Sequence, residues 1–211
     1  MKSLTTLFVL FFFAQLISAQ SPAYNPQVKL LDVQHYRFSL ALKDDTDRIE
    51  GSAEIKLRFK QSSNVFFLDL VKNKAGKGMD VSSVTLENKP LAFSHQDERL
   101  SITLPQASQA GQELNIVVQY AGVPADGLII DANKFGDRTF FGDNWPNRAH
   151  HWLPCVDHPS DKASVEFLVT APDHYQVVSN GIQIEETNLD GGLRRTHWKE
   201  TAPLPMKVAV I

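Results

Sequence analysis

The side chains of this chain that could do chemistry are concentrated between residues 141 and 163. This segment reads Phe-Gly-Asp-Asn-Trp-Pro-Asn-Arg-Ala-His-His-Trp-Leu-Pro-Cys-Val-Asp-His-Pro-Ser-Asp-Lys-Ala. Histidine, cysteine and aspartate can bind zinc, and a cysteine beside a histidine can act as a nucleophile. The two chemistries to consider first are therefore a metal centre and a thiol site.

The spacing of these residues does not favour a metal centre. Zinc needs three or four converging ligands, which usually come from short spacings such as Cys-x2-Cys or His-x3-His. The candidate ligands lack such spacings and are His150, His151, Cys155, Asp157 and His158. If residues 149–153 are extended, His150 and His151 point to opposite faces and cannot share a metal. We predict structural roles for these side chains and assign no metal ligand.

A thiol nucleophile needs a lowered pKa and a neighbouring base, which His151 or His158 could supply to Cys155. The alternative, which we favour, is a small buried side chain beside Pro154, because free cysteines are among the most buried residues. The sequence contains no His-Glu-x-x-His helix, no Gly-x-Ser-x-Gly elbow and no glycine-rich phosphate loop. No catalytic residue is therefore assigned.

The aromatic residues of the segment allow two interpretations. An exposed cluster could bind a sugar or a peptide side chain, whereas a buried cluster would fill the core or a domain interface. The residues concerned are Phe140, Phe141, Trp145 and Trp152. We expect Asp157, Asp161 and Lys162 to organise a loop through local hydrogen bonds and an ion pair.

The elements around this segment are predicted to be strands, because apolar and polar residues alternate. Residues 65–70 form a more continuous apolar run, which suits a strand covered on both faces. Asn180-Gly181 predicts a type I′ hairpin turn. Together these patterns predict an all-β sandwich of mostly antiparallel strands with long connections. The predicted strands are residues 35–42, 49–59, 65–70, 81–86, 100–104, 114–120, 164–170, 175–178, 182–186 and 193–199.

The two ends of the chain differ from the rest. Residues 1–19 are predicted to be a cleaved signal peptide, with Lys2 before an apolar run and small residues before the cleavage point. We therefore expect export to the periplasm or the extracellular space, no stable membrane anchor, a leader over residues 20–32 and one domain over residues 33–211. Residues 205–211 are predicted to be an unprotected edge strand, which suggests a chain shorter than its relatives.

Composition narrows the functional classes further. The chain has 211 residues, of which 43% are hydrophobic, and a formal net charge of −3. This charge gives no indication of binding to nucleic acid or to an anionic membrane surface. Because Cys155 is the only cysteine, no internal disulfide can form. Stability must come from the core.

Two stretches carry a resemblance to a known family. Arg148-Ala-His-His-Trp-Leu-Pro-Cys-Val-Asp-His-Pro-Ser-Asp-Lys-Ala163 and Val177-Val-Ser-Asn-Gly181 resemble the N-terminal domain of zinc aminopeptidases of the aminopeptidase N and leukotriene A4 hydrolase type. The preceding Phe141-Gly-Asp-Asn-Trp-Pro146 resembles a bacterial branch of that family. The resemblance implies a saddle-like β-sandwich that docks a thermolysin-like catalytic domain. Zinc and the catalytic residues of the family enzyme would lie outside this sequence, so we expect this chain alone to be inactive.

The resemblance also implies one contact with substrate. Family members place a Gln or Glu of this domain near the free amino group of the peptide, at the position that Trp145 occupies here. Asp143 and Asn144 are the nearest polar substitutes, so Asp143, Asn144 and Trp145 are the predicted substrate-binding residues; a plain Asp-Asn turn is the alternative. At His150 relatives often carry Arg, so an ion pair there would depend on pH. The functional alternative is a stand-alone binding module without peptidase activity.

Overall fold

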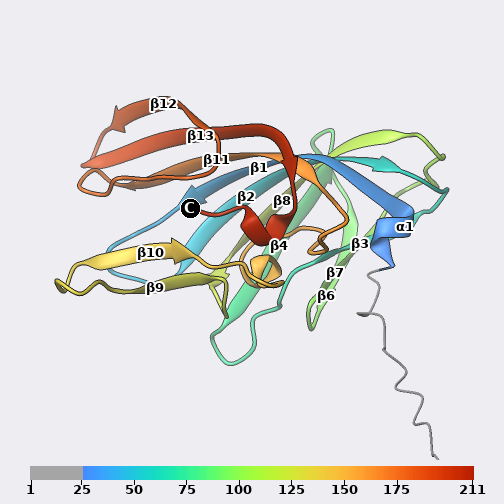
Figure 1. Cartoon of the computed structure of the whole chain (residues 1–211). Helices are drawn as coiled ribbons and strands as arrows, with labels where there is room; N and C mark the ends of the chain where they lie inside the picture. Colours follow the sequence, from blue (N-terminus) through green and yellow to red (C-terminus); the bar gives the residue numbers. More distant parts are fainter. Residues whose placement is uncertain (1–25) are drawn as a thin grey trace, which may run out of the picture.

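A computed structural model describes residues 26–211, and most of this part of the chain forms one large sheet with two smaller sheets beneath it (Figure 1). The large sheet has eight strands in the order β12-β13-β11-β1-β2-β8-β4-β5. Their bounds are β1 Leu31–Ala41, β2 Ile49–Phe59, β4 Gly78–Leu86, β5 Lys89–Pro90, β8 Glu113–Val123, β11 Ala163–Pro172, β12 Ile182–Leu189 and β13 Leu193–Leu204.

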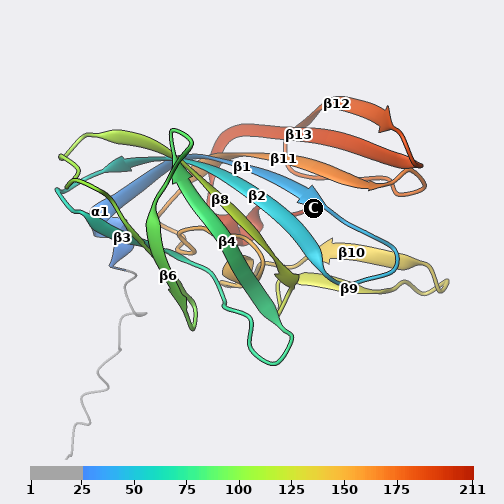
Figure 2. The same cartoon turned by 180° about the vertical axis from the view of Figure 1, so that it is seen from behind.

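The smaller sheets lie under opposite ends of the large one, as Figures 1 and 2 show from two sides. One sheet has the order β3-β7-β6, and the other is the β9-β10 hairpin. A short helix and two 3₁₀ turns complete the described chain. The bounds are β3 Val65–Asp69, β6 Ala92–Gln96, β7 Arg99–Thr103, β9 Leu128–Ala132, β10 Arg138–Gly142, α1 Gln27–Leu30, η1 Ala149–His151 and η2 Met206–Val208. The predicted all-β sandwich is confirmed.

The core lies between the large sheet and the layer beneath it. In β2 the inward residues Ile55, Leu57 and Phe59 are fully buried, whereas Lys56 and Arg58 between them face solvent. The predicted alternation therefore arises from one face packed on the core and one wet face.

The wet face carries an ion network centred on Glu166, which accepts hydrogen bonds from Lys199 Nζ at 2.7 Å and His197 Nε2 at 3.0 Å.

One pair of strands at the centre of the large sheet is parallel. Strand β1 pairs with β11 in register from His35 opposite Ser164 to Ala41 opposite Thr170, whereas the other pairs of this sheet are antiparallel. The hydroxyl of Ser164 and Nδ1 of His35 are 2.8 Å apart. This pair brings the segment after residue 163 beside the first strand of the domain.

Three local predictions were wrong. Residues 65–70 are not covered on both faces, because Val65 of β3 is 45% exposed. Residues 175–178 form no strand; the carbonyl oxygen of Val177 instead accepts a hydrogen bond from Trp198 Nε1 at 3.1 Å. The Asn180-Gly181 pair makes no type I′ hairpin, since Gly181 has a φ of +84° but Asn180 does not have a positive φ.

The expected edge strand over residues 205–211 is also wrong. This segment contains the 3₁₀ turn η2 and buries Met206 and Ala209 almost completely. It joins no strand ladder. Its backbone groups instead bind side chains of two other segments, and the carbonyl oxygen of Ile211 accepts a hydrogen bond from the Gly142 N–H.

The predicted signal peptide over residues 1–19 lies outside the described residues, as does much of the predicted leader over residues 20–32. The last part of that range is structured, because α1 occupies Gln27–Leu30 and β1 begins at Leu31. Within residues 26–211, no helix has the length and apolar character needed to cross a bilayer.

Candidate functional site

The predicted substrate-binding residues follow β10 directly and precede η1. Asp143 is held by Arg148, whose Nη2 donates to Asp143 Oδ2 at 2.5 Å. The same guanidinium donates to Asp126 Oδ1 at 3.3 Å and to the carbonyl oxygen of Trp145 at 2.6 Å. Arg148 therefore fixes the shape of this loop. It also orients the Asp143 carboxylate, which remains partly exposed.

Asn144 points into the protein. Its side chain is 1% exposed, its Oδ1 accepts a hydrogen bond from Trp152 Nε1 at 2.8 Å, and its Nδ2 donates to the carbonyl oxygen of Ala209 at 2.6 Å. A second contact from Nδ2 reaches the carbonyl oxygen of Met206 at 3.3 Å. These bonds occupy both ends of the amide, so its geometry suits a structural link between three segments.

Trp145 lies on the surface beside Asp143. Its ring is 58% exposed, and Lys207 Nζ sits 4.1 Å from the ring centroid, which is a cation–π contact. Of the four aromatic residues considered from the sequence, Phe141 is also exposed, whereas Trp152 is fully buried and Phe140 packs edge-on against Tyr175. The aromatic residues thus divide between surface and core.

The two adjacent histidines do not point to opposite faces. Residues 149–151 form η1 instead of an extended segment, and the two rings are 4.7 Å apart. His150 Nδ1 lies 2.7 Å from Asp157 Oδ2. Burial alone would lower the pKa of His150, but the hydrogen bond and charge of Asp157, with Asp69 and Glu98, raise it overall. His150 and Asp157 are thus placed to form an ion pair when the imidazole is protonated.

The pKa of the neighbouring His151 is shifted in the opposite direction. Burial and the adjacent His150 lower the pKa of its imidazole. Its Nδ1 is buried and has no hydrogen-bond partner among residues 26–211. A neutral imidazole is therefore favoured at this position.

Cys155 is placed for packing. It is fully buried, and burial, followed by the charges of Asp157, Asp69 and Asp161, raises the pKa of its thiol well above the ordinary value. A thiol in that state is a poor nucleophile and a poor metal ligand. No group of three or more His, Cys, Asp or Glu side chains in the described part of the chain is arranged to hold a metal ion. The residues present do not fit a zinc centre, and no step through zinc can be assigned to them.

An apolar groove of about 460 Å³ lies next to the Asp143–Trp145 loop. Sequence reasoning missed it, because its walls come from segments that are far apart in the chain. The side chains that shape it include Phe140, Phe141, Tyr175, Val178, Val210 and Ile211. Phe141 and Val178 on its rim are 61% and 58% exposed, respectively. The groove is open to solvent and apolar.

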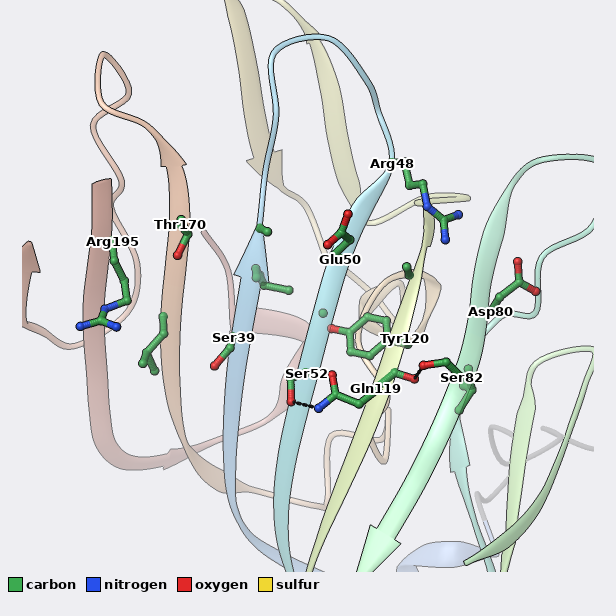
Figure 3. A pocket seen from close by; sticks show the side chains of 16 residues that line it. Ser39, Arg48, Glu50, Ser52, Asp80, Ser82, Gln119, Tyr120, Thr170 and Arg195 are labelled. Carbon is green, nitrogen blue, oxygen red and sulfur yellow. Dashed lines mark hydrogen bonds between the residues drawn. The ribbon is translucent and has the colours of Figure 1, made fainter. Parts of the chain in front are cut away.

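A larger hollow of about 720 Å³ lies on the wet face of the large sheet and is lined by both polar and apolar residues (Figure 3). Ser52 accepts a hydrogen bond from Gln119 Nε2 at 2.9 Å, and Ser82 donates to the carbonyl oxygen of Gln119 at 3.3 Å. Arg48 and Arg195 stand near its two ends, as Figure 3 shows. Gln119 thus binds the hydroxyl groups of Ser52 and Ser82, whereas the buried hydroxyl of Tyr120 has no hydrogen-bond partner among residues 26–211.

Comparison with known proteins places these features in context. Residues 32–206 match the family model described as the peptidase M1 N-terminal domain. A search among curated proteins gave no match. Among solved structures, an M1 zinc metallopeptidase from Deinococcus radiodurans is similar over 86% of this chain, with 24% identity and a TM-score of 0.75. A yeast LTA4 hydrolase in complex with bestatin is similar over 90% of this chain, with 21% identity and a TM-score of 0.72.

This chain spans 41% of the length of the Deinococcus protein and 31% of the length of the yeast protein. The expectation of a thermolysin-like catalytic domain as partner is wrong, because the similar structures are M1 zinc metallopeptidases and an LTA4 hydrolase.

Proposed function

We propose, from the premise that this chain belongs to the M1 peptidase family as its N-terminal domain, that it docks an M1 catalytic domain and shapes the substrate entrance of an exported zinc aminopeptidase. Export by residues 1–19 belongs to this proposal. Sequencing the N-terminus of the secreted protein is its test, with Gln20 as the expected first residue.

The observation that carries the docking proposal is an exposed apolar surface around the groove. We call Ile129, Phe141, Trp145, Val178 and Val208 the docking surface; each is more than 40% exposed. Phe141 pairs directly with Ile129 across the β9-β10 hairpin, and Phe141 and Val178 line the same groove. Apolar patches of this kind are typical of surfaces that another protein covers.

The chemistry of the groove indicates an apolar occupant. The Ser179 hydroxyl and the Asn180 amide beside it already bind backbone groups of Val208 and Val210. A charged group placed there would be desolvated without a partner. A catalytic domain presenting aliphatic or aromatic side chains satisfies this condition.

The entrance role rests on Asp143, which is partly exposed beside Trp145 at the edge of the docking surface. A carboxylate accepts several hydrogen bonds, so Asp143 can bind a substrate ammonium while it remains paired with Arg148. Asn144 contributes indirectly, because its amide is buried and occupied.

The docking test is a binding measurement between the purified chain and a separately expressed M1 catalytic domain from the same genome. Phe141→Glu should weaken binding at least about tenfold, because it places a charge in a desolvated apolar contact. Val65→Glu is the matched control, since Val65 is similarly exposed on β3, which lies beneath the opposite end of the large sheet from the β9-β10 hairpin (Figures 1 and 2). Absence of binding by the wild-type chain, or equal binding by both variants, would refute the proposal.

An activity assay separates this proposal from one in which the chain is itself a peptidase. The purified chain with added zinc should not hydrolyse aminoacyl substrates, since its residues do not fit a zinc centre. Zinc-dependent turnover that persists in the absence of any other protein would contradict the docking role.

A further inference from the structure

Residues 208–211 are held from two sides, although they belong to no strand. On one side the Gly142 N–H donates to the carbonyl oxygen of Ile211 at 2.9 Å, and Asn144 Nδ2 donates to that of Ala209 at 2.6 Å. On the other side Ser179 Oγ donates to the carbonyl oxygen of Val210 at 2.6 Å. Alternate carbonyl groups thus point to opposite sides, as they do in a strand between two neighbours.

Asn180 completes this arrangement by taking the place of a strand backbone. Its Nδ2 donates to the carbonyl oxygen of Val208 at 3.0 Å, and its Oδ1 accepts from the N–H of Val210 at 2.8 Å. One side-chain amide therefore supplies the donor and the acceptor that a paired strand would offer to the same edge. This explains why the segment is ordered without a ladder partner.

Each of the two segments contains a glycine that allows a close approach to another part of the chain. A Cβ on Gly142 would lie 2.9 Å from Val210 Cβ and 3.1 Å from the backbone nitrogen of Ile211. Gly181 has a φ of +84°, and a Cβ there would lie 2.0 Å from the carbonyl oxygen of Lys199. Gly142 thus lets its own segment approach residues 208–211, whereas Gly181 lets its segment pack against β13. Through their hydrogen bonds, Phe141-Gly-Asp-Asn144 and Ser179-Asn-Gly181 converge on the same short target, residues 208–211.

The target forms one wall of the apolar groove. Val210 and Ile211 line the groove together with Phe141, and Val208 belongs to the docking surface. We propose that Asn144, Ser179 and Asn180 are positioning residues that clamp residues 208–211, so that the docking surface is preformed before a catalytic domain binds. This inference rests on the proposed function, and it assigns a positioning role to residues of two stretches that resemble the family, Phe141–Pro146 and Val177–Gly181.

Preformation has an energetic consequence. A partner that meets an ordered wall does not have to order it on binding, which would otherwise cost affinity. Loss of the clamp should therefore weaken docking even though none of the three residues contributes an apolar contact.

The clamp is tested first on the chain alone, by hydrogen–deuterium exchange of the peptide that covers residues 205–211. Asn180→Ala should accelerate exchange of the Val210 amide about fivefold to tenfold, the effect of one net hydrogen bond. Asn188→Ala is the matched control, because this exposed asparagine on β12 binds only a side chain, Arg194 Nε at 3.0 Å. Unchanged exchange in Asn180→Ala would overturn the clamp, whatever the docking assay shows.

The positioning role is tested with the same variants in the docking assay. Asn180→Ala should bind the M1 catalytic domain more weakly than Asn188→Ala does, and Ser179→Ala should have a smaller effect in the same direction. Faster exchange with unchanged docking would overturn the positioning role but leave the proposed function intact. A wild-type chain that does not bind would instead refute the proposed function, and the positioning role with it.

Discussion

Replacing Asp161 by asparagine should change how stability depends on pH. Asp161 is 3% exposed, its Oδ1 accepts a hydrogen bond from the Val33 N–H at 3.3 Å, and its Oδ2 is buried without a partner among the described residues. Burial raises the pKa of this carboxyl from 3.8 to about 7, because the Val33 N–H and the charge of Lys60 compensate only in part. The folded protein therefore holds a proton that the unfolded chain has lost.

The sign follows from proton linkage. Between about pH 4 and pH 7 the folded state binds more protons at Asp161 than the unfolded state does, so its contribution to stability falls as pH rises and then levels off. With the two pKa values above, the free energy of unfolding should fall by about 2–3 kcal/mol from this group between pH 5 and pH 8. Asparagine keeps the acceptor for Val33 but cannot ionise.

Urea unfolding of the wild-type and Asp161→Asn proteins, followed by circular dichroism from pH 5 to pH 8, measures this difference. The variant should gain stability relative to wild type as pH rises, by about 2–3 kcal/mol over the range. Asp190→Asn, at an exposed turn, is the control for removing a negative charge. If the wild-type and Asp161→Asn curves run parallel, the assignment of a buried, protonated Asp161 is refuted.

Three further predictions follow from single contacts. His150→Gln should lose most stability below about pH 6.5 and little at high pH. Asp157 stabilises the fold when the His150 imidazole is protonated, and this stabilisation is lost as pH rises through the raised pKa of the imidazole. Urea unfolding at both ends of this pH range tests the prediction. Cys155 should not react with a thiol reagent in the folded protein and should react fully in urea, and rapid labelling under native conditions would contradict its burial. Gly51→Ala should destabilise the fold by about 1–3 kcal/mol, since its Cβ would lie 2.3 Å from Tyr120 Cζ; an unchanged thermal midpoint would show that the ring can move freely.

The strands with one wet face could be predicted from the sequence, because a period of two residues reports burial directly. Strand β2 begins and ends at the predicted residues, Ile49 and Phe59. For residues 175–178 the same apolar content gave a wrong prediction, since strand formation depends on a neighbour at the right distance, and here the neighbouring group is the Trp198 indole. Local sequence does not contain that information.

The candidate site shows the same limit. The sequence located the segment that contains Asp143, Asn144 and Trp145, but the three side chains have different environments. Asp143 is held by the nearby Arg148, whereas the contacts of Asn144 and Trp145 come from residues about 60 positions away. The bond between Asn144 and Ala209, for example, is set by how two distant segments fold together. Likewise, the spacing of His150 and His151 does not reveal that they lie in a 3₁₀ turn.

The parallel pairing of β1 with β11 has a consequence for the order in which the strands of the large sheet can fold together. His35 and Ser164, which meet in this pair, are separated by 129 positions in the chain. During synthesis, β1 can pair with β2 early, but its other edge stays open until β11 has left the ribosome. Contacts between residues so distant in sequence slow folding. Over that interval an open strand that carries Tyr36 and Phe38 is available to other nascent chains, so β11 is the element whose arrival ends the period of greatest aggregation risk.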